Sequence, residues 1–169
     1  KQKIINFNKD YKIWNMIRYL NTEITFAEVP DEISLCINIL DCDRRCKGCH
    51  SRFLWDGTMD EYGTNLTIYE LDKLIDENSG ISCVCFMGGL DFPYVDKLAS
   101  HVKSRGIKSA WYIYKDDMPD GMHLENFDYV KFGAYIEDRG PLNSKTTNQV
   151  MYRITPEGNK EDITYKLWK

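Results

Sequence analysis

The sequence predicts an α/β fold with a mostly parallel sheet that ends in a C-terminal β-hairpin. Short apolar runs of strand length alternate with segments whose apolar residues recur at helical spacing. Such alternation favours parallel strands joined by right-handed crossovers. The length of 169 residues suits one domain, because it allows about two thirds of the unfolded surface to be buried without disulfides. We therefore expect a single domain over residues 1–169.

The alternation begins with residues 33–40 (ISLCINIL), an apolar run typical of a buried strand. A helix is predicted next, over residues 67–80, because Thr67 and Glu70 form a capping box ahead of an apolar helical face. Residues 81–89 (ISCVCFMGG) predict a second buried strand. A second amphipathic helix follows, and its apolar face consists of Val95, Leu98, Ala99 and Val102.

Two further strands are predicted over residues 107–114 (IKSAWYIY) and 128–136 (DYVKFGAYI), with an irregular stretch between them. The tail, residues 150–168, predicts the terminal hairpin around a Pro-Glu-Gly-Asn turn. Its two arms are expected to alternate Val150, Tyr152 and Ile154 against Ile163, Tyr165 and Leu167. Residues 1–30 show mixed periodicity and no convincing helix cap, so no structure is predicted for this N-terminal segment.

Composition argues against two classes of partner. The net charge of −4 disfavours nucleic-acid binding, because a surface that binds phosphates needs an excess of Lys and Arg. No apolar run approaches the roughly 20 residues needed to span a membrane, and no signal-peptide pattern opens the chain. Three cysteines crowded into residues 42–49 suit a metal in a reducing compartment better than disulfides. We therefore expect a cytoplasmic protein that binds neither nucleic acid nor membrane.

The chemistry is concentrated in residues 41–51 (DCDRRCKGCHS), where Cys42, Cys46 and Cys49 form a C-x3-C-x2-C pattern without a fourth cysteine. One interpretation is structural zinc with His50 as fourth ligand, although no distant second pair of ligands follows. The other is a [4Fe-4S] cluster held by three thiolates, with one iron left open for a ligand. Three more cysteines lie within predicted strands, where a free thiol normally behaves as a small buried hydrophobe: Cys36, Cys83 and Cys85.

A glycine pair, Gly88 and Gly89, ends the strand that follows the cysteine motif. Parallel strands present their carboxyl ends at one edge of the sheet, and ligands bind outside that edge. Neighbouring strands are about 5 Å apart, so a metal on the first loop and a ligand on the second could touch. Glycine lets the main chain approach a ligand closely, although a plain strand-to-helix turn would use the same residues.

This combination of C-x3-C-x2-C loop and Gly-Gly strand end resembles the radical S-adenosylmethionine (SAM) enzymes. Residues 46–55 (CKGCHSRFLW) are similar to the activating proteins of anaerobic ribonucleoside-triphosphate reductase. Residues 129–154 (YVKFGAYIEDRGPLNSKTTNQVMYRI) are similar to the carboxyl-terminal segment of that family, including its Thr-Asn-Gln motif. The resemblance extends from about Met16 to Ile154.

The resemblance implies a small partial (β/α) barrel of the radical SAM type. It implies a [4Fe-4S] cluster on Cys42, Cys46 and Cys49, with SAM bound to the open iron. It also implies cofactor-binding roles for Gly88, Gly89, Asp91, His50 and Asn148. The chain departs from the family where Lys47 replaces a common proline, where the sequence GGLD places the acidic residue one position late, and where Val150 replaces a frequent arginine.

The function implied is that of a glycyl-radical activase. In this family, reductive cleavage of SAM produces a radical that removes hydrogen from one glycine of the large reductase subunit. The implied partners are that subunit and a flavodoxin-like or ferredoxin-like electron donor, and no acid, base or nucleophilic side chain is needed. Two alternatives remain open: a radical SAM enzyme that acts on a small molecule, and a zinc-stabilised interaction module.

Overall fold

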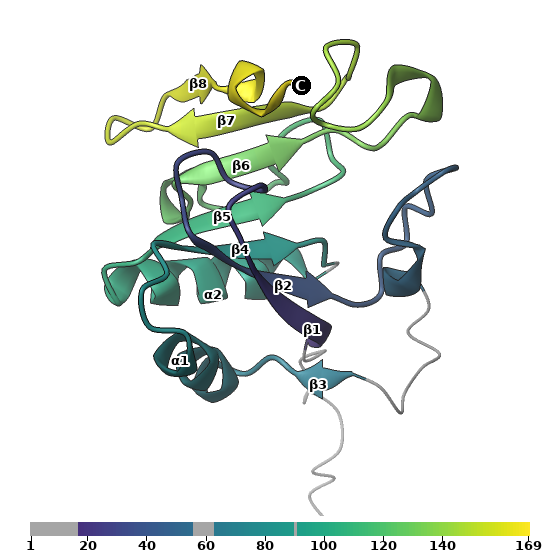
Figure 1. Ribbon diagram of the computed structural model, residues 1–169. Coiled ribbons are helices and arrows are strands. Elements are labelled where there is room, and N and C mark those ends of the chain that lie inside the picture. Colours follow the sequence, from purple (N-terminus) through teal and green to yellow (C-terminus); the bar gives the residue numbers. More distant parts are fainter. Residues whose placement is uncertain (1–16, 56–62, 90) are drawn as a thin grey trace, which may run out of the picture.

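The computed structural model describes residues 17–55, 63–89 and 91–169, and the N-terminal residues 1–16 lie outside the described part (Figure 1). Within these ranges, eight strands form one sheet in the order β3-β1-β2-β4-β5-β6-β7-β8. The strands are β1 Arg18–Thr25, β2 Ser34–Ile39, β3 Thr64–Asn65, β4 Cys83–Met87, β5 Lys108–Tyr112, β6 Tyr129–Phe132, β7 Val150–Ile154 and β8 Lys160–Asp162. The α-helices are α1 Ile68–Glu77 and α2 Phe92–Ser104, and the 3-10 turns are η1 Arg52–Leu54, η2 Leu124–Asn126, η3 Glu137–Arg139 and η4 Thr164–Leu167.

The prediction of a mostly parallel sheet in a partial (β/α) barrel is wrong. Among the described residues, four of the seven strand pairings are antiparallel and only two α-helices are present. Parallel pairing is confined to the central strands β2, β4, β5 and β6. Strands β3 and β8 are the two edges of the sheet, so the described strands form an open mixed sheet.

One feature of the sequence concealed the antiparallel side of this sheet. Strand β1 lies near one edge of the sheet, and Tyr19 is the one residue along it that is buried. It therefore lacks the continuous apolar run of a central strand, although it pairs along its length with β2. The connection from β5 to β6, expected to be irregular, carries only the short turn η2, so it does not cover the sheet as the α-helix of a β/α unit would.

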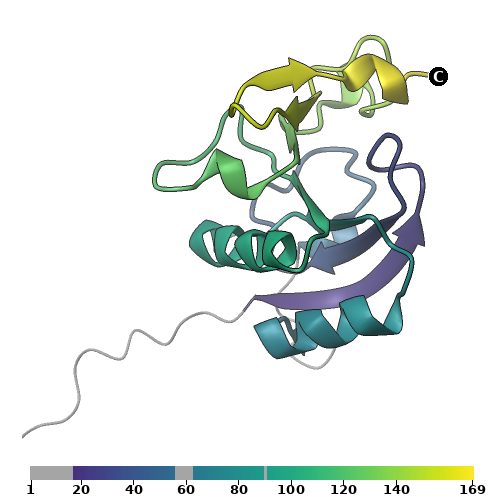
Figure 2. The ribbon, with the colours of Figure 1, turned by 90° about the vertical axis from the view of Figure 1, so that its left-hand side faces the viewer.

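The two faces of the sheet carry different residues because side chains alternate along each strand. Both α-helices pack on one face; Figure 2 shows them on the outer side of the curved sheet. The core there includes Leu35, Ile37, Ile39, Val84, Phe86 and Trp111 from the sheet. The opposite face is lined by Cys36, Cys83, Cys85, Ala110, Tyr129 and Met151, and is covered by Val29 and Ile163. Neither helix of the described chain has the length and apolar character needed to cross a membrane.

Half of the capping box predicted for the first helix is confirmed: the Thr67 hydroxyl oxygen accepts a hydrogen bond from the Glu70 amide at 3.0 Å, and α1 starts at the next residue, Ile68. The reciprocal half does not form, because the Glu70 carboxylate accepts from the Tyr19 hydroxyl at 2.7 Å and the Thr67 amide donates to the Asn65 carbonyl. The C-terminal hairpin differs from the prediction in its second arm. Strand β8 is shorter and earlier than expected, because Asp162 accepts hydrogen bonds from both the amide and the hydroxyl of Thr164. This local turn replaces the extended arm with η4.

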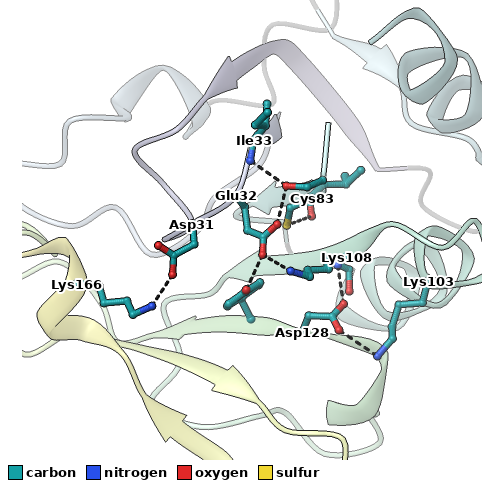
Figure 3. Close-up of polar contacts among 12 residues, drawn as sticks. Asp31, Glu32, Ile33, Cys83, Lys103, Lys108, Asp128 and Lys166 are labelled. Carbon is teal, nitrogen blue, oxygen red and sulfur yellow. Dashed lines mark hydrogen bonds and ion pairs between the residues drawn. The ribbon is translucent and has the colours of Figure 1, made fainter. Parts of the chain in front are cut away.

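A buried carboxylate joins the starts of the four parallel strands. Glu32, which is only 4% exposed, precedes β2 and accepts a hydrogen bond from the hydroxyl of Ser82, just before β4, at 2.6 Å. It also accepts hydrogen bonds from Lys108 in β5 and from the hydroxyl of Tyr129 in β6. Figure 3 shows Glu32 and Lys108 pointing toward each other at these strand starts. One side chain thus links four strands at their amino-terminal ends.

We predict that Glu32→Gln lowers the free energy of unfolding by about 2–3 kcal/mol at pH 7, the usual worth of buried hydrogen bonds to a charge. Burial alone would raise the pKa of Glu32, but the hydrogen bonds from Lys108, Ser82 and Tyr129 outweigh it and hold that pKa below its usual value of 4.5. The carboxylate therefore stabilises the fold fully above pH 4.5, and this contribution is lost as the pH falls through the lowered pKa. Urea unfolding between pH 3 and pH 7 measures both effects.

Glu161→Gln is the matched control, because Glu161 also pairs with a cation, Arg153, but both side chains are about half exposed. We expect this control to cost no more than about 1 kcal/mol. Equal losses in the two variants, or a Glu32→Gln deficit that stays constant down to pH 3, would contradict the assigned role of Glu32.

Candidate functional site

A cleft of about 510 Å³ lies beyond the carboxyl ends of the parallel strands. Its volume falls within the usual range for small-molecule sites. Its walls come from the loops that follow each of the four parallel strands and from the β1–β2 connection. The lining residues used below are Glu28, Cys42, Cys46, Cys49, His50, Leu54, Trp55, Gly88, Tyr112, Tyr114, Lys131, Gly133, Tyr135 and Gln149.

All three cysteines of the C-x3-C-x2-C motif line this cleft and are half-buried. The loop that carries them turns sharply, since Asp41, Arg45 and Gly48 all have φ angles between 47° and 73°. Backbone hydrogen bonds close it, from the Cys42 amide to the Leu54 carbonyl and from the Cys49 amide to the Cys46 carbonyl. In Figure 1 this segment extends past the end of β2, on the side where β4 and β5 also end.

The sulfurs interact electrostatically. Burial, followed by the neighbouring sulfurs of Cys46 and Cys49, raises the pKa of the Cys42 thiol, and a backbone hydrogen bond at Arg44 opposes this. The Ser51 amide donates a hydrogen bond to the Cys49 sulfur at 3.3 Å. Three thiolates in one cleft need a compensating positive charge, which metal binding supplies as it displaces the protons.

Among the described side chains, no three of His, Cys, Asp or Glu converge closely enough to hold a single metal ion. In a [4Fe-4S] cluster each thiolate binds a different iron, so the sulfurs stand farther apart than the ligands of one ion. Three cysteines that share one cleft wall therefore fit the donor set of a cluster.

The segment after β6 packs against the cysteine loop. Lys47 and Glu137 form an ion pair at 2.9 Å, and the ring of His50 lies 5.6 Å from that of Tyr135. A side chain at Gly48 would approach the Glu137 carboxylate to 3.0 Å, so glycine permits this packing. The cysteine loop and the segment after β6, 90 residues apart in sequence at Lys47 and Glu137, are thus in contact, and His50 lines the cleft.

The two glycines after β4 have different surroundings. Gly88 lines the cleft; its amide donates to the Tyr112 carbonyl at 3.0 Å, and its carbonyl accepts from the Trp111 indole at 2.9 Å. Gly89 is not among the lining residues, and a Cβ there would approach Val95 and Ile39 at 3.3 and 3.4 Å. Gly89 therefore meets the helix-side core, while Gly88 is the glycine at the cleft.

Two further predicted site residues also lie away from the cleft lining. The Asp91 carboxylate caps α2 by accepting from the Tyr94 amide at 3.2 Å. The side-chain amide nitrogen of Asn148 donates to the Ala134 carbonyl at 2.9 Å. The side-chain oxygen of Asn148, Oδ1, is buried without a hydrogen-bond partner. The neighbouring Gln149 is the residue of the Thr-Asn-Gln motif that lines the cleft.

Lys131 is a site residue that the sequence analysis missed. Its ammonium donates hydrogen bonds to the Gly133 carbonyl at 2.9 Å and to the Gln149 side-chain oxygen at 3.0 Å. Burial lowers the pKa of Lys131 to about 8, while the sulfurs of Cys46, Cys42 and Cys49 act in the opposite direction. The available signal was a lysine within an otherwise apolar strand, YVKF, where a charge must have a specific partner.

The sequence matches no model of a known protein family, and no curated protein matches it significantly.

We predict that Gly89→Val destabilises the protein more than Gly88→Ala does. Both glycines have positive φ angles, 86° at Gly88 and 97° at Gly89, so any side chain costs about 1–2 kcal/mol at either position. Valine at Gly89 adds about 1–3 kcal/mol from overpacking against Val95 and Ile39, whereas a Cβ at Gly88 meets only the Ile39 carbonyl at 3.7 Å. Urea unfolding of both variants measures the difference, and equal losses would contradict the assignment of Gly89 to the core.

Proposed function

We propose that the protein is an activase that uses a [4Fe-4S] cluster and SAM to generate a glycyl radical on the large subunit of anaerobic ribonucleoside-triphosphate reductase. One observation carries this proposal. Cys42, Cys46 and Cys49, with no fourth cysteine, line the same cleft as Gly88, which follows the adjacent parallel strand. A three-thiolate donor set leaves one iron open, and the cleft volume leaves room for a ligand beside it.

The cofactors supply the one-electron chemistry when bound, namely reductive cleavage of the SAM sulfonium. The chain binds, orients and shields them. Gly88 lets a ligand approach its backbone closely, because no Cβ projects there. Aromatic and apolar side chains form much of the cleft wall, namely Leu54, Trp55, Tyr112, Tyr114 and Tyr135. These side chains restrict the access of water to the bound cofactors.

Exposed apolar residues on the segments that form the cleft support a protein substrate. Four large apolar side chains are exposed, each next in sequence to a residue that lines the cleft: Phe26, Phe53, Ile136 and Trp168. Exposed apolar side chains on the segments that form a cleft offer contacts to a docking protein. A docking loop of the reductase would cover them and exclude water from the radical.

The cysteine loop also carries cations that suit an acidic electron donor of the flavodoxin or ferredoxin type: Arg44, Arg45, Lys47 and Arg52. A cluster with an open iron reacts with oxygen, so the proposed setting is an anaerobic, reducing cytoplasm.

We predict that Cys42→Ala, Cys46→Ala and Cys49→Ala each lose the cluster, because no spare thiolate lines the cleft. Wild-type protein reconstituted anaerobically should contain about four irons per chain, and each variant far less. Cys83→Ala is the matched control, since Cys83 is fully buried on the sheet and should affect stability alone. Full iron retention in Cys42→Ala would refute the ligand assignment, and a colourless wild type that binds zinc would favour the interaction module.

The activity is tested by mixing the reduced protein anaerobically with SAM and the large reductase subunit. We expect methionine and 5'-deoxyadenosine in equal amounts and a glycyl-radical doublet in the EPR spectrum of the reductase. Deuterium on the Cα of the target glycine should appear in the 5'-deoxyadenosine, and the Cys42→Ala variant should give neither signal. Unlabelled 5'-deoxyadenosine without a doublet would instead point to a small-molecule substrate.

A further inference from the structure

A buried cation lies in the wall of the cleft. Lys131 is only 7% exposed, yet its side chain lines the cleft together with the three cysteines. A buried charge costs much free energy unless it is hydrogen-bonded and serves an interaction that repays this cost. The residue therefore calls for an explanation beyond packing.

The position of the ammonium is determined by two oxygens on different segments. The Gly133 carbonyl accepts at 2.9 Å and the Gln149 side-chain oxygen at 3.0 Å. Gly133 has a φ of 95°, and a Cβ there would come within 3.2 Å of the Asn148 carbonyl and of the Gln149 Cα. The missing side chain thus allows the Asn148–Gln149 backbone to lie close enough for Gln149 to reach Lys131.

Both hydrogen-bond acceptors are neutral, so they orient the ammonium without cancelling its charge. The ammonium also lies 5.5 Å from the centre of the Tyr112 ring, a second neutral group. Lys131 shares the cleft with the three cysteines, whose sulfurs raise its pKa electrostatically against the effect of burial. In such a poorly hydrated site the effective dielectric constant is low, and a charge acts over a longer distance than at the surface.

We propose that Lys131, oriented by Gln149, supplies the positive charge that raises the reduction potential of a cluster bound by Cys42, Cys46 and Cys49. The inference rests on the proposed function, because it requires the cluster. Reduction adds one negative charge to the thiolate-bound centre, and a fixed cation nearby stabilises the reduced form. Net charge and solvent exposure around a cluster are recognised determinants of its potential. Lys131 acts by its electric field, and Gln149 is a positioning residue.

The test is an anaerobic redox titration of the reconstituted protein without SAM, followed by EPR. For Lys131→Met, which keeps the volume but removes the charge, we expect the ratio of reduced to oxidised cluster at a given potential to fall about tenfold. For a one-electron couple this corresponds to a reduction potential about 59 mV lower. Lys131→Arg should stay near the wild type. Gln149→Glu should also lower the potential, because its carboxylate would neutralise the ammonium while Lys131 remains.

Lys47→Met is the matched control. Lys47 lies in the cysteine loop itself, but its side chain is 89% exposed and paired with Glu137. Water and the carboxylate screen its charge, so we expect a much smaller shift than for Lys131→Met. This comparison separates the effect of a buried charge from the loss of any lysine near the cluster.

The outcomes distinguish this inference from the proposed function. If the wild type binds no cluster, the proposed function fails. If it binds a cluster and cleaves SAM, but Lys131→Met shifts the potential no more than Lys47→Met, only the role of Lys131 is overturned. If Lys131→Met does not load iron, Gln149→Glu decides: a lowered potential supports the role, and an unchanged one refutes it.

Discussion

The parallel pairing of β2 with β4 is the constraint on which the rest of the structure depends. Its register runs from Ser34 opposite Cys83 to Asn38 opposite Met87, so the two strands end at the same edge. The cysteine loop leaves the first strand and Gly88 follows the second, and both therefore line one cleft. A slip in this register would separate them and would also break the link that Glu32 makes to Ser82 at the other edge.

The two ends of the parallel strands have different roles for a physical reason. At their starts, a buried carboxylate with several hydrogen bonds holds the strands together. Along their length, the α-helices bury one face of the sheet. At their carboxyl ends the backbone departs into loops that carry thiols, a glycine and a buried ammonium. Loops can vary in chemistry because the sheet beneath them supplies rigidity. The proposed radical chemistry requires this separation, since the thiolates must keep fixed positions while a partner docks above them.

A buried lysine in β6 bears on the charge balance of the candidate site. Three thiolates favour a nearby cation, and Lys131 supplies one from within the sheet. Its hydrogen bonds to Gly133 and Gln149 link β6 to the segment before β7. That segment also follows η3, whose Glu137 pairs with Lys47 in the cysteine loop. The terminal hairpin was predicted, but the antiparallel pairing of its first strand, β7, with β6 was not, and this pairing brings the segment before β7 to the site.

Local signals determined what the sequence could establish by itself. The cysteine spacing, the N-cap of α1 at Thr67 and the apolar runs of β2 and β4 depend on residues close together in the chain, and the sequence alone revealed them. Only the tertiary structure decided that β1 pairs with β2 and that the sheet is mixed, because a half-exposed strand has no distinctive apolar pattern. It also decided that Gly88 rather than Gly89, and Gln149 rather than Asn148, reach the cleft. Neighbouring residues with similar side chains differ in these roles only through the direction of the backbone, which long-range packing determines.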